Sequence, residues 1–467
     1  MEKKIKGERK MATNKERYEF IETMFDKLDS ISVERIVGHY IKLIPKGRHW
    51  MGLCPFHRDT KLGSFIVTPD RGIWKCFSCG DDYAGNGVKF VSLYKHITYL
   101  DAAFDTALEF GLISYDEYRK YSKKKYDADY VRKLEKRYSE KKKNIQMPKK
   151  ANPVIIHNVY QCMKDCCTLN PEHRKALITE RKLSTERIEK DYFSCPTNWR
   201  QKDAIINKIK EKYPVYHDDI LKTVPGFFYD KKHQKLTFTG YKGLCILIRN
   251  AEGHIEAIQI RKDTIKEGDS RYVWFSSTFA YYNANDYDGG CGCGSPKDVC
   301  YPQYQGKHTL CITEGRFKSE RLTESGNISV SVQGVASWQG IEETIGKIRD
   351  IHNVFLFFDS DILGKHVLFV QSEKMAEKIK ERYPALHLRY AFWSKKYGKG
   401  IDDCIIAGNI EKVKLYELPD AINICNGAFE DALKKYGITC LQELKQEKVK
   451  EFECYLQSLT ESRLGLS

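Results

Sequence analysis

The sequence lacks long hydrophobic segments. Apolar runs such as Val354–Phe358 end after five residues, whereas a membrane-spanning helix needs about 20. The first ten residues, MEKKIKGERK, are charged and hold no apolar stretch of the kind found in a secretory signal. We therefore expect a cytoplasmic protein without a membrane partner. The chain also lacks an internal repeat, and its nearest approach to a phosphate-binding loop, Gly340–Ile348, has one residue too many between its glycines and no Ser or Thr after Lys347.

The chain is too long for one ordinary domain. Its 467 residues suggest two to four domains, and an aromatic content of 12% argues against wholesale disorder. The net charge of +15 favours a polyanionic partner such as nucleic acid. Residues 119–150 hold 14 Lys and Arg against four acids, which is +10 of that total. This basic stretch is either a solvated, partly helical linker or a strip that binds a nucleic-acid backbone, and the two interpretations are compatible.

Cysteine spacing indicates one metal site. Cys54 and His57 form a short-spaced pair, and Cys76 and Cys79 form a second pair after eighteen residues. Two such pairs joined by a hairpin suit a tetrahedral structural Zn²⁺ with four protein ligands. The hairpin is expected as strands over 64–68 and 73–77, with a turn over 69–72. Another group, Cys291, Cys293 and Cys300, lies in a Gly-rich loop; a second metal there stays open, although ordinary loop thiols are favoured.

The rest of the chain changes character along its length. Residues 221–275 alternate as in a mainly antiparallel sheet, with a hairpin turn at 250–253. From about Gly306 the pattern becomes α/β, with strands and helices in alternation up to the segment 399–408. The tail from about Ala421 is expected to be helical. The division expected is 1–115, 116–150, 151–305, 306–415 and 416–467, for a multidomain α+β and α/β protein.

Acidic residues follow two strands of the expected α/β unit. Glu314 ends one strand, and Asp359 and Asp361 follow another. Ligands of open α/β sheets bind outside the carboxyl ends of the strands, so neighbouring strands would bring these three carboxylates together. Such oxygen ligands suit Mg²⁺ or Mn²⁺, and a Glu plus Asp-x-Asp site serves phosphoryl or nucleotidyl transfer. Acids also commonly cap helices at such turns. Asp402 and Asp403 would add weaker contacts.

Basic side chains on the flanking elements would hold triphosphates or a template. Each of them has an alternative as an ordinary exposed charge of a sheet or helix. The candidates are Arg249, Arg261, Lys262, Arg271, Arg316 and Lys318.

These motifs together resemble bacterial-type (DnaG-like) DNA primases. The CPFH and CFSCG segments are similar to the N-terminal zinc ribbon of that family, and ITEG and DSD are similar to the motifs of the TOPRIM fold. The segment Gly243–Arg261 is similar to a strand–turn–strand of the family that ends in Arg. The resemblance covers about residues 30–110 and 220–410. It implies a zinc-ribbon domain followed by a primase core, built of a mixed β subdomain and a TOPRIM α/β subdomain.

The resemblance also implies roles. The zinc domain would bind single-stranded DNA template, and Glu314, Asp359 and Asp361 would bind catalytic Mg²⁺ or Mn²⁺. Arg249, Arg261 and Lys262 would line the template or nucleotide groove. The reaction would join NTPs into short RNA primers, with a replicative helicase acting in trans.

The chain departs from cellular primases in two motifs. After Glu314-Gly315 it has RFKSE instead of aromatic-x-Asp, so the usual helper carboxylate is missing, and Glu320 is a candidate substitute. The later Lys-Asp-x-Asp motif appears as Lys399-Gly-Ile-Asp402-Asp403. These wordings, with the loop Gly292–Pro296, are closer to primase-like proteins of plasmids, integrative elements and phages.

Two other functions compete with a mobile-element primase. One is a TOPRIM nuclease or topoisomerase, and the other is a non-catalytic zinc and TOPRIM protein that binds DNA during replication. The intact acidic set argues against the non-catalytic alternative.

Overall fold

The computed structural model describes residues 14–57, 59, 62–122, 125–140, 149–265, 270–304, 308–439, 441–444 and 446–466. The chain divides into a first unit, residues 1–146, and a second unit, residues 147–467, which are described separately. Within the described ranges, no helix is long and apolar enough to cross a membrane.

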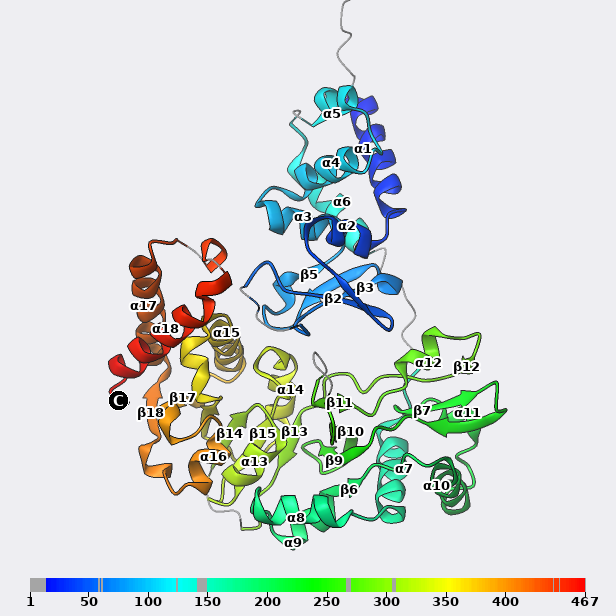
Figure 1. Ribbon diagram of the computed structural model, residues 1–467, viewed down its shortest axis with the longest axis vertical. Coiled ribbons are helices and arrows are strands. Elements are labelled where there is room, and N and C mark those ends of the chain that lie inside the picture. The colour runs from blue at the N-terminus through cyan, green and yellow to red at the C-terminus, as the bar shows by residue number, and fades with distance from the viewer. Residues whose placement is uncertain are drawn as a thin grey trace, which may run out of the picture. The chain divides into compact units, whose positions relative to one another are not determined.

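The described residues of the first unit form a small antiparallel sheet and six α-helices (Figure 1). The strands pair in the order β1-β2-β3-β4-β5. The elements are α1 (Asn14–Asp29), α2 (Val33–Tyr40), β1 (Ile44–Lys46), β2 (His49–Gly52), β3 (Phe65–Thr68), β4 (Ile73–Cys76), β5 (Ala84–Gly85), α3 (Gly87–Lys95), α4 (Tyr99–Glu109), α5 (Tyr115–Tyr121) and α6 (Ala128–Glu140). The predicted hairpin is confirmed: β3 pairs with β4 across the turn Pro69–Arg71, and Gly72 takes a positive φ.

Part of the basic stretch folds into this unit. Arg137 on α6 forms an ion pair with Glu22 on α1 at 2.6 Å, and the Tyr138 hydroxyl donates to Asp26 at 2.8 Å. Residues 123–124 and 141–148 of the stretch lie outside the described residues. The finer division into five segments, including a linker over 116–150, stays a prediction.

Three sheets are found in the part of the second unit that the structure describes, and two of them are antiparallel. One has the strand order β11-β10-β9-β6 and the other β12-β7-β8. The predicted antiparallel region and its hairpin turn are confirmed, because β9 and β10 pair across Asn250–Gly253, where Gly253 has a φ of +82°. The strands are β6 (Tyr192–Ser194), β7 (Phe227–Asp230), β8 (Lys235–Phe238), β9 (Gly243–Arg249), β10 (Ile255–Lys262), β11 (Tyr272–Trp274) and β12 (Tyr287–Asp288).

The third sheet has six strands in the order β13-β15-β14-β16-β17-β18. The four central strands are parallel, and the two edge strands run antiparallel to them. The strands are β13 (Asp298–Cys300), β14 (Thr309–Thr313), β15 (Ile328–Ser331), β16 (Asn353–Phe357), β17 (His387–Phe392) and β18 (Lys414–Glu417). The mixed α+β and α/β fold class is therefore confirmed.

Helices cover both faces of this sheet because side chains alternate along each strand. Leu310 and Ile312 of β14 belong to the core that α14 (Ile341–Gly346), α15 (His366–Arg382) and α17 (Leu418–Tyr436) complete. Cys311 between them faces the opposite core, with α13 (Arg316–Thr323) and α16 (Ile401–Ile406). The other helices of the unit are α7 (Pro153–Cys166), α8 (Pro171–Thr179), α9 (Thr185–Asp191), α10 (Trp199–Lys212), α11 (Asp218–Leu221), α12 (Thr278–Tyr282) and α18 (Val449–Arg463).

Candidate zinc centre and acidic site

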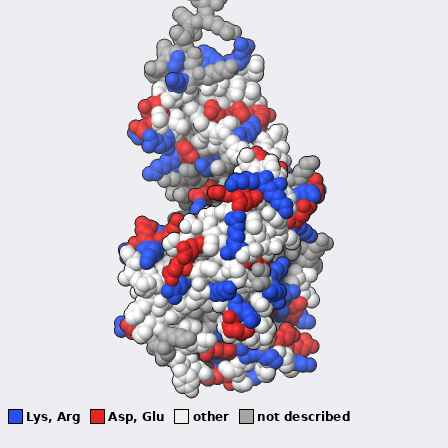
Figure 2. All heavy atoms as spheres, turned by 90° about the vertical axis from the view of Figure 1, so that its left-hand side faces the viewer, with Lys and Arg blue, Asp and Glu red and all other residues white. Residues whose placement is uncertain are grey.

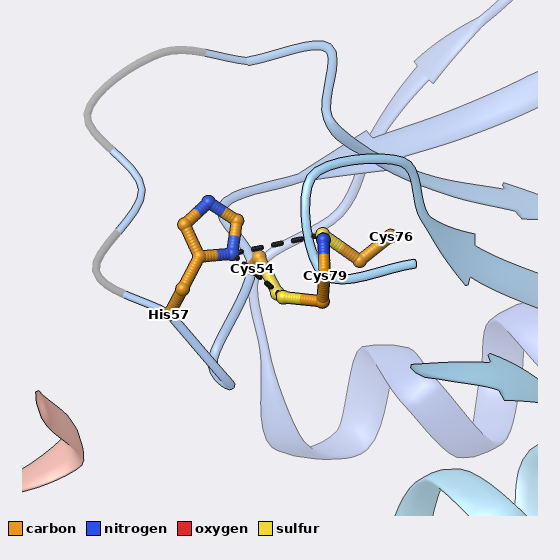
Figure 3. A group of neighbouring side chains, drawn as sticks. All are labelled: Cys54, His57, Cys76 and Cys79. Atoms are coloured by element: carbon orange, nitrogen blue, oxygen red, sulfur yellow. Dashed lines mark hydrogen bonds between the residues drawn. The ribbon is translucent and has the colours of Figure 1, made fainter. Parts of the chain in front are cut away.

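Four side chains of the first unit converge as a metal site. Cys54 and His57 lie in the turn after β2, whereas Cys76 ends β4 and Cys79 lies in the turn that follows. Their ligand atoms all lie within 4.8 Å of one another, and the side chains point toward a common centre (Figure 3). Cys54 Sγ and Cys79 Sγ are 3.8 Å apart, and His57 Nδ1 is 3.6 Å from Cys76 Sγ. Tetrahedral Zn²⁺ with Zn–S bonds of about 2.3 Å requires S–S edges of about 3.8 Å, so the group fits zinc.

The surrounding residues hold these ligands in place. Phe56, between the first two ligands, packs against Phe65 and Trp74, and the Trp74 indole donates to the Asn86 carbonyl at 2.9 Å. His57 Nε2 lies 3.8 Å from Asp59 Oδ1. A carboxylate behind a ligating histidine fixes the ring orientation and makes the other nitrogen a better ligand.

The second group of cysteines forms no metal cluster with any other described residue. Within the described ranges, the ribbon is the one group of three or more metal-type side chains whose ligand atoms come so close together. The Cys291 thiol instead donates to the Thr223 carbonyl at 3.0 Å, and the Cys293 thiol donates to the Phe275 carbonyl at 3.2 Å. These are buried structural thiols of the Gly-rich loop.

The acids of the second unit meet at one edge of the six-stranded sheet. β14 and β16 are adjacent and parallel, and Thr313 is paired with Phe357. Glu314 and Asp359, which follow these strands, therefore leave the sheet side by side, and the Asp359 amide donates to Glu314 Oε1 at 3.4 Å. Asp361 follows in a short 3₁₀ turn, Ser360–Gly364.

Lysine side chains stand between these carboxylates. Lys318 Nζ contacts Asp359 and lies 3.8 Å from Glu314 Oε2. Lys399 Nζ lies 3.4 Å from both Asp359 Oδ2 and Asp361 Oδ2. The acids are therefore bridged by ammonium groups.

The pKa values reflect this crowding. Burial raises the pKa of the Glu314 carboxyl, and the neighbouring Asp359 charge adds to the rise even though Lys318 opposes it. Burial also acts to raise the pKa of Asp361, but the ammonium groups of Lys365 and Lys399 outweigh it and hold that pKa below its usual range. Burial raises the pKa of Asp402, and Asp403 adds to the rise.

A cavity of about 520 Å³ opens beside the acids. It lies between the sheet β11-β10-β9-β6 and the carboxyl ends of the parallel strands of the six-stranded sheet. A hydrogen bond of 2.9 Å from Gln259 on β10 to Gln333, which follows β15, joins the two sheets. Its charged lining residues are Glu314, Asp359, Asp402, Asp403, Arg181, Arg271, Arg316, Lys318 and Lys399. Acids beside cations in one cavity suit a metal-bound, phosphate-bearing ligand.

The two later acids differ in their surroundings. Asp402 is 5% exposed and forms an ion pair of 3.0 Å with Arg181, a residue that the sequence analysis did not single out. Asp403 accepts a hydrogen bond from the Gly400 amide at 3.2 Å and so caps α16. Arg181 follows helix α8, far from Asp402 along the chain, so no local motif could have indicated this ion pair.

Two of the candidate basic residues are held in a buried network. The Arg316 guanidinium contacts Asp191, Asp298 and Glu320, and Arg249 donates to Asp191 at 2.7 Å. Both guanidinium groups are therefore paired with buried acids and stabilise the fold. Arg316 also forms part of the cavity wall. Glu320, the candidate helper carboxylate, is fully buried in this network and is absent from the cavity wall.

The other basic candidates remain near the cavity or on the adjacent strand. Arg271 is exposed on the cavity rim. Arg261 and Lys262 end β10, where Arg261 is opposite Tyr272, and Lys262 lies over the Tyr241 ring. Within each unit, Figure 2 shows positive and negative side chains interspersed on the face in view.

Comparison with known proteins finds matches in both units of the chain. Residues 17–122 match the CHC2 zinc finger family, and residues 303–412 match a domain of unknown function, DUF3854. The DNA primase of Aquifex aeolicus is 36% identical over 108 residues, which is 23% of this chain and 19% of that protein. The DNA primase of Mycoplasma genitalium is 25% identical over 396 residues, or 82% of this chain and 59% of the relative.

Among solved structures, the zinc-binding and RNA polymerase domains of the Aquifex aeolicus primase are similar at a TM-score of 0.40 and 16% identity. That similarity covers 95% of this chain and 98% of the other. The chain spans less than two thirds of the length of the curated relatives it matches. The matched zinc-finger family and the sequence relatives confirm the resemblance to bacterial-type DNA primases with a Cys-His-Cys-Cys zinc ribbon.

Proposed function

We propose that this chain is a DNA primase, a nucleotidyltransferase that synthesises short RNA primers on single-stranded DNA for replication of a mobile element or phage. One combination of features carries the proposal. A CHC2 zinc finger shares the chain with an acidic cavity at the carboxyl ends of adjacent parallel strands, and the sequence relatives are DNA primases.

The acidic residues fit a divalent cation. Glu314, Asp359 and Asp361 offer the hard oxygen donors that Mg²⁺ and Mn²⁺ prefer, and ammonium groups already bridge them. These three residues would hold the metal, with weaker contributions from Asp402 and Asp403. When bound, such a metal activates an attacking 3′-hydroxyl and stabilises charge on the reacting phosphate.

The basic residues would position the nucleotide and the template. Arg271 on the rim and Lys399, whose side chain is 56% exposed, can reach a triphosphate in the cavity. Arg261 and Lys262 continue from the cavity along β10 and would contact the template backbone. We assign Arg249 and Arg316 to holding the cavity walls, because buried acids occupy both guanidinium groups.

The remaining parts of the proposal concern partners and domains. The zinc ribbon of the first unit would bind single-stranded template and help to select start sites, and a helicase would act in trans. The five-segment division proposed from the sequence assigns the antiparallel sheets to 151–305 and the metal site to 306–415.

Primer synthesis tests this proposal directly. The zinc-loaded full chain is incubated with a mixed-sequence single-stranded DNA, labelled NTPs and Mg²⁺, alongside Asp359→Ala and the matched control Asp420→Ala, an exposed acid at the start of α17. Because Asp359 is a predicted metal ligand, we expect short labelled oligomers from the wild type and the control and none from Asp359→Ala. Equal synthesis by Asp359→Ala would remove the assigned site.

The same assay addresses the alternatives. Lys318 and Lys399 neutralise the acids, and a non-catalytic replication protein could hold its acids in the same way. DNA binding without synthesis on varied templates, with either NTPs or dNTPs, would favour that function. Cleaved DNA or a covalent protein–DNA product would favour a nuclease or topoisomerase.

A further inference from the structure

Lys318, Lys365 and Lys399 all reach the acidic site, and Lys318 and Lys399 differ most in how firmly they are held. The Lys318 side chain is 17% exposed and comes from α13, directly behind the acids. The Lys399 side chain is 56% exposed and comes from the loop before α16. Both have carboxylate partners, yet the more exposed Lys399 side chain can move into solvent more readily than Lys318.

Lys318 places a positive charge between two of the acids. Its ammonium group contacts Asp359 and faces Glu314, so it balances the charge of two carboxylates in the way that a metal ion would. Lys318 also stands four residues after Glu314, where the cellular primases that the chain resembles have their helper aspartate.

We propose that Lys318 is a built-in cation that takes the place of one divalent ion, so that the acidic site binds a single Mg²⁺ or Mn²⁺. That ion would bind between Asp359 and Asp361, where the Lys399 ammonium now lies 3.4 Å from an oxygen of each. The inference deepens the proposed function and concerns the same site. It rests on the position and burial of Lys318, independently of whether primers are made.

Counting bound Mn²⁺ tests the inference. Electron paramagnetic resonance measures free Mn²⁺ during titration of the full, zinc-loaded chain, and Asp359→Asn corrects for ions bound elsewhere. We expect one ion at this site in the wild type and two in Lys318→Asp, since that substitution removes a positive charge and adds an oxygen ligand. Two ions in the wild type, or one in a folded Lys318→Asp, would overturn the proposal.

Two further variants separate charge from fold. Lys318→Arg keeps the positive charge and should keep one ion. Lys399→Met removes the exposed ammonium between Asp359 and Asp361 and leaves Lys365 on Asp361, so we expect still one ion, bound severalfold more tightly. If Lys318→Asp fails to fold, a second ion in Lys318→Met would support the inference instead, because Glu314 and Asp359 would then lack a cation; one ion in folded Lys318→Met would contradict it.

The Mn²⁺ count and primer synthesis can fail separately. A wild type that binds one ion and makes no primers leaves the role of Lys318 intact and refutes the primase. A wild type that makes primers with two bound ions supports the primase and refutes the role of Lys318.

Discussion

Replacing Arg316 by methionine should destabilise the second unit strongly. The Arg316 side chain is 4% exposed, and its partners Asp298 and Glu320 are fully buried. Methionine fills a similar volume but leaves those carboxylates without their shared cation. Breaking a buried ion pair from one side costs about 3–5 kcal/mol. For a unit of this size we expect a fall in Tm of about 10 °C.

The loss should depend on pH in a defined direction. Burial raises the pKa of Asp298 to about 6, even with Arg316 acting to lower it. An acid whose pKa is higher in the folded state costs stability once the pH exceeds its unfolded value, and the cost is complete above the folded pKa. Removing Arg316 moves the folded pKa further up. The difference in unfolding free energy between wild type and variant should therefore be larger at pH 8 than at pH 5.5.

Urea unfolding of the full chain, followed by tryptophan fluorescence, measures both effects. Arg389→Met is the matched control, because Arg389 pairs with Glu417 at 2.5 Å on the surface, with side chains 39% and 53% exposed. Exposed pairs contribute about 1 kcal/mol or less. If Arg316→Met resembled this control, or if its loss did not change with pH, the buried network would not carry the charge balance described here.

Two further predictions concern the zinc ribbon and a buried lysine. Cys79→Ser should lower bound zinc, and proteases should then cut the first unit while the second stays resistant, since a structural zinc site contributes folding energy; an equally resistant zinc-free ribbon would contradict this. Burial lowers the pKa of Lys297 to about 8. Lys297 keeps its proton to higher pH in the unfolded chain than in the folded one. The unfolding free energy of the wild type should therefore rise between about pH 8 and pH 10 relative to that of Lys297→Met. Parallel pH curves for the two proteins would show that Lys297 does not titrate there.

The zinc ligands and the acidic edge could be predicted because their signals are local. Cys54 and His57 share one turn, and Cys76 and Cys79 share another, so spacing alone indicates the site. Glu314 and Asp359 each follow a buried apolar strand, which the sequence shows. That β14 and β16 are neighbours in the sheet is known only from the structure. Edge strand β18 was missed because none of its residues is buried and its pattern carries no alternation.

The basic residues could not be assigned from the sequence for a different reason. Arg316 reads as an exposed cation at a helix start, but Asp191, one of its partners, is 125 residues away along the chain. Whether an arginine is solvated or buried depends on such distant acids, and a single sequence does not show them. The same holds for Lys318, a predicted nucleotide or template contact, whose ion pair with Asp359 no local pattern indicates.

Helix α13 joins these two findings. Arg316 and Glu320 are one helical turn apart and pair at 2.8 Å, so they lie on one face of the helix, inside the buried network. Lys318, midway between them, lies on the opposite face and meets the acids. The network that fixes the helix therefore also fixes where the Lys318 ammonium is presented. A charge held this way is positioned before any ligand arrives, which is the property that distinguishes Lys318 from the exposed Lys399 beside it.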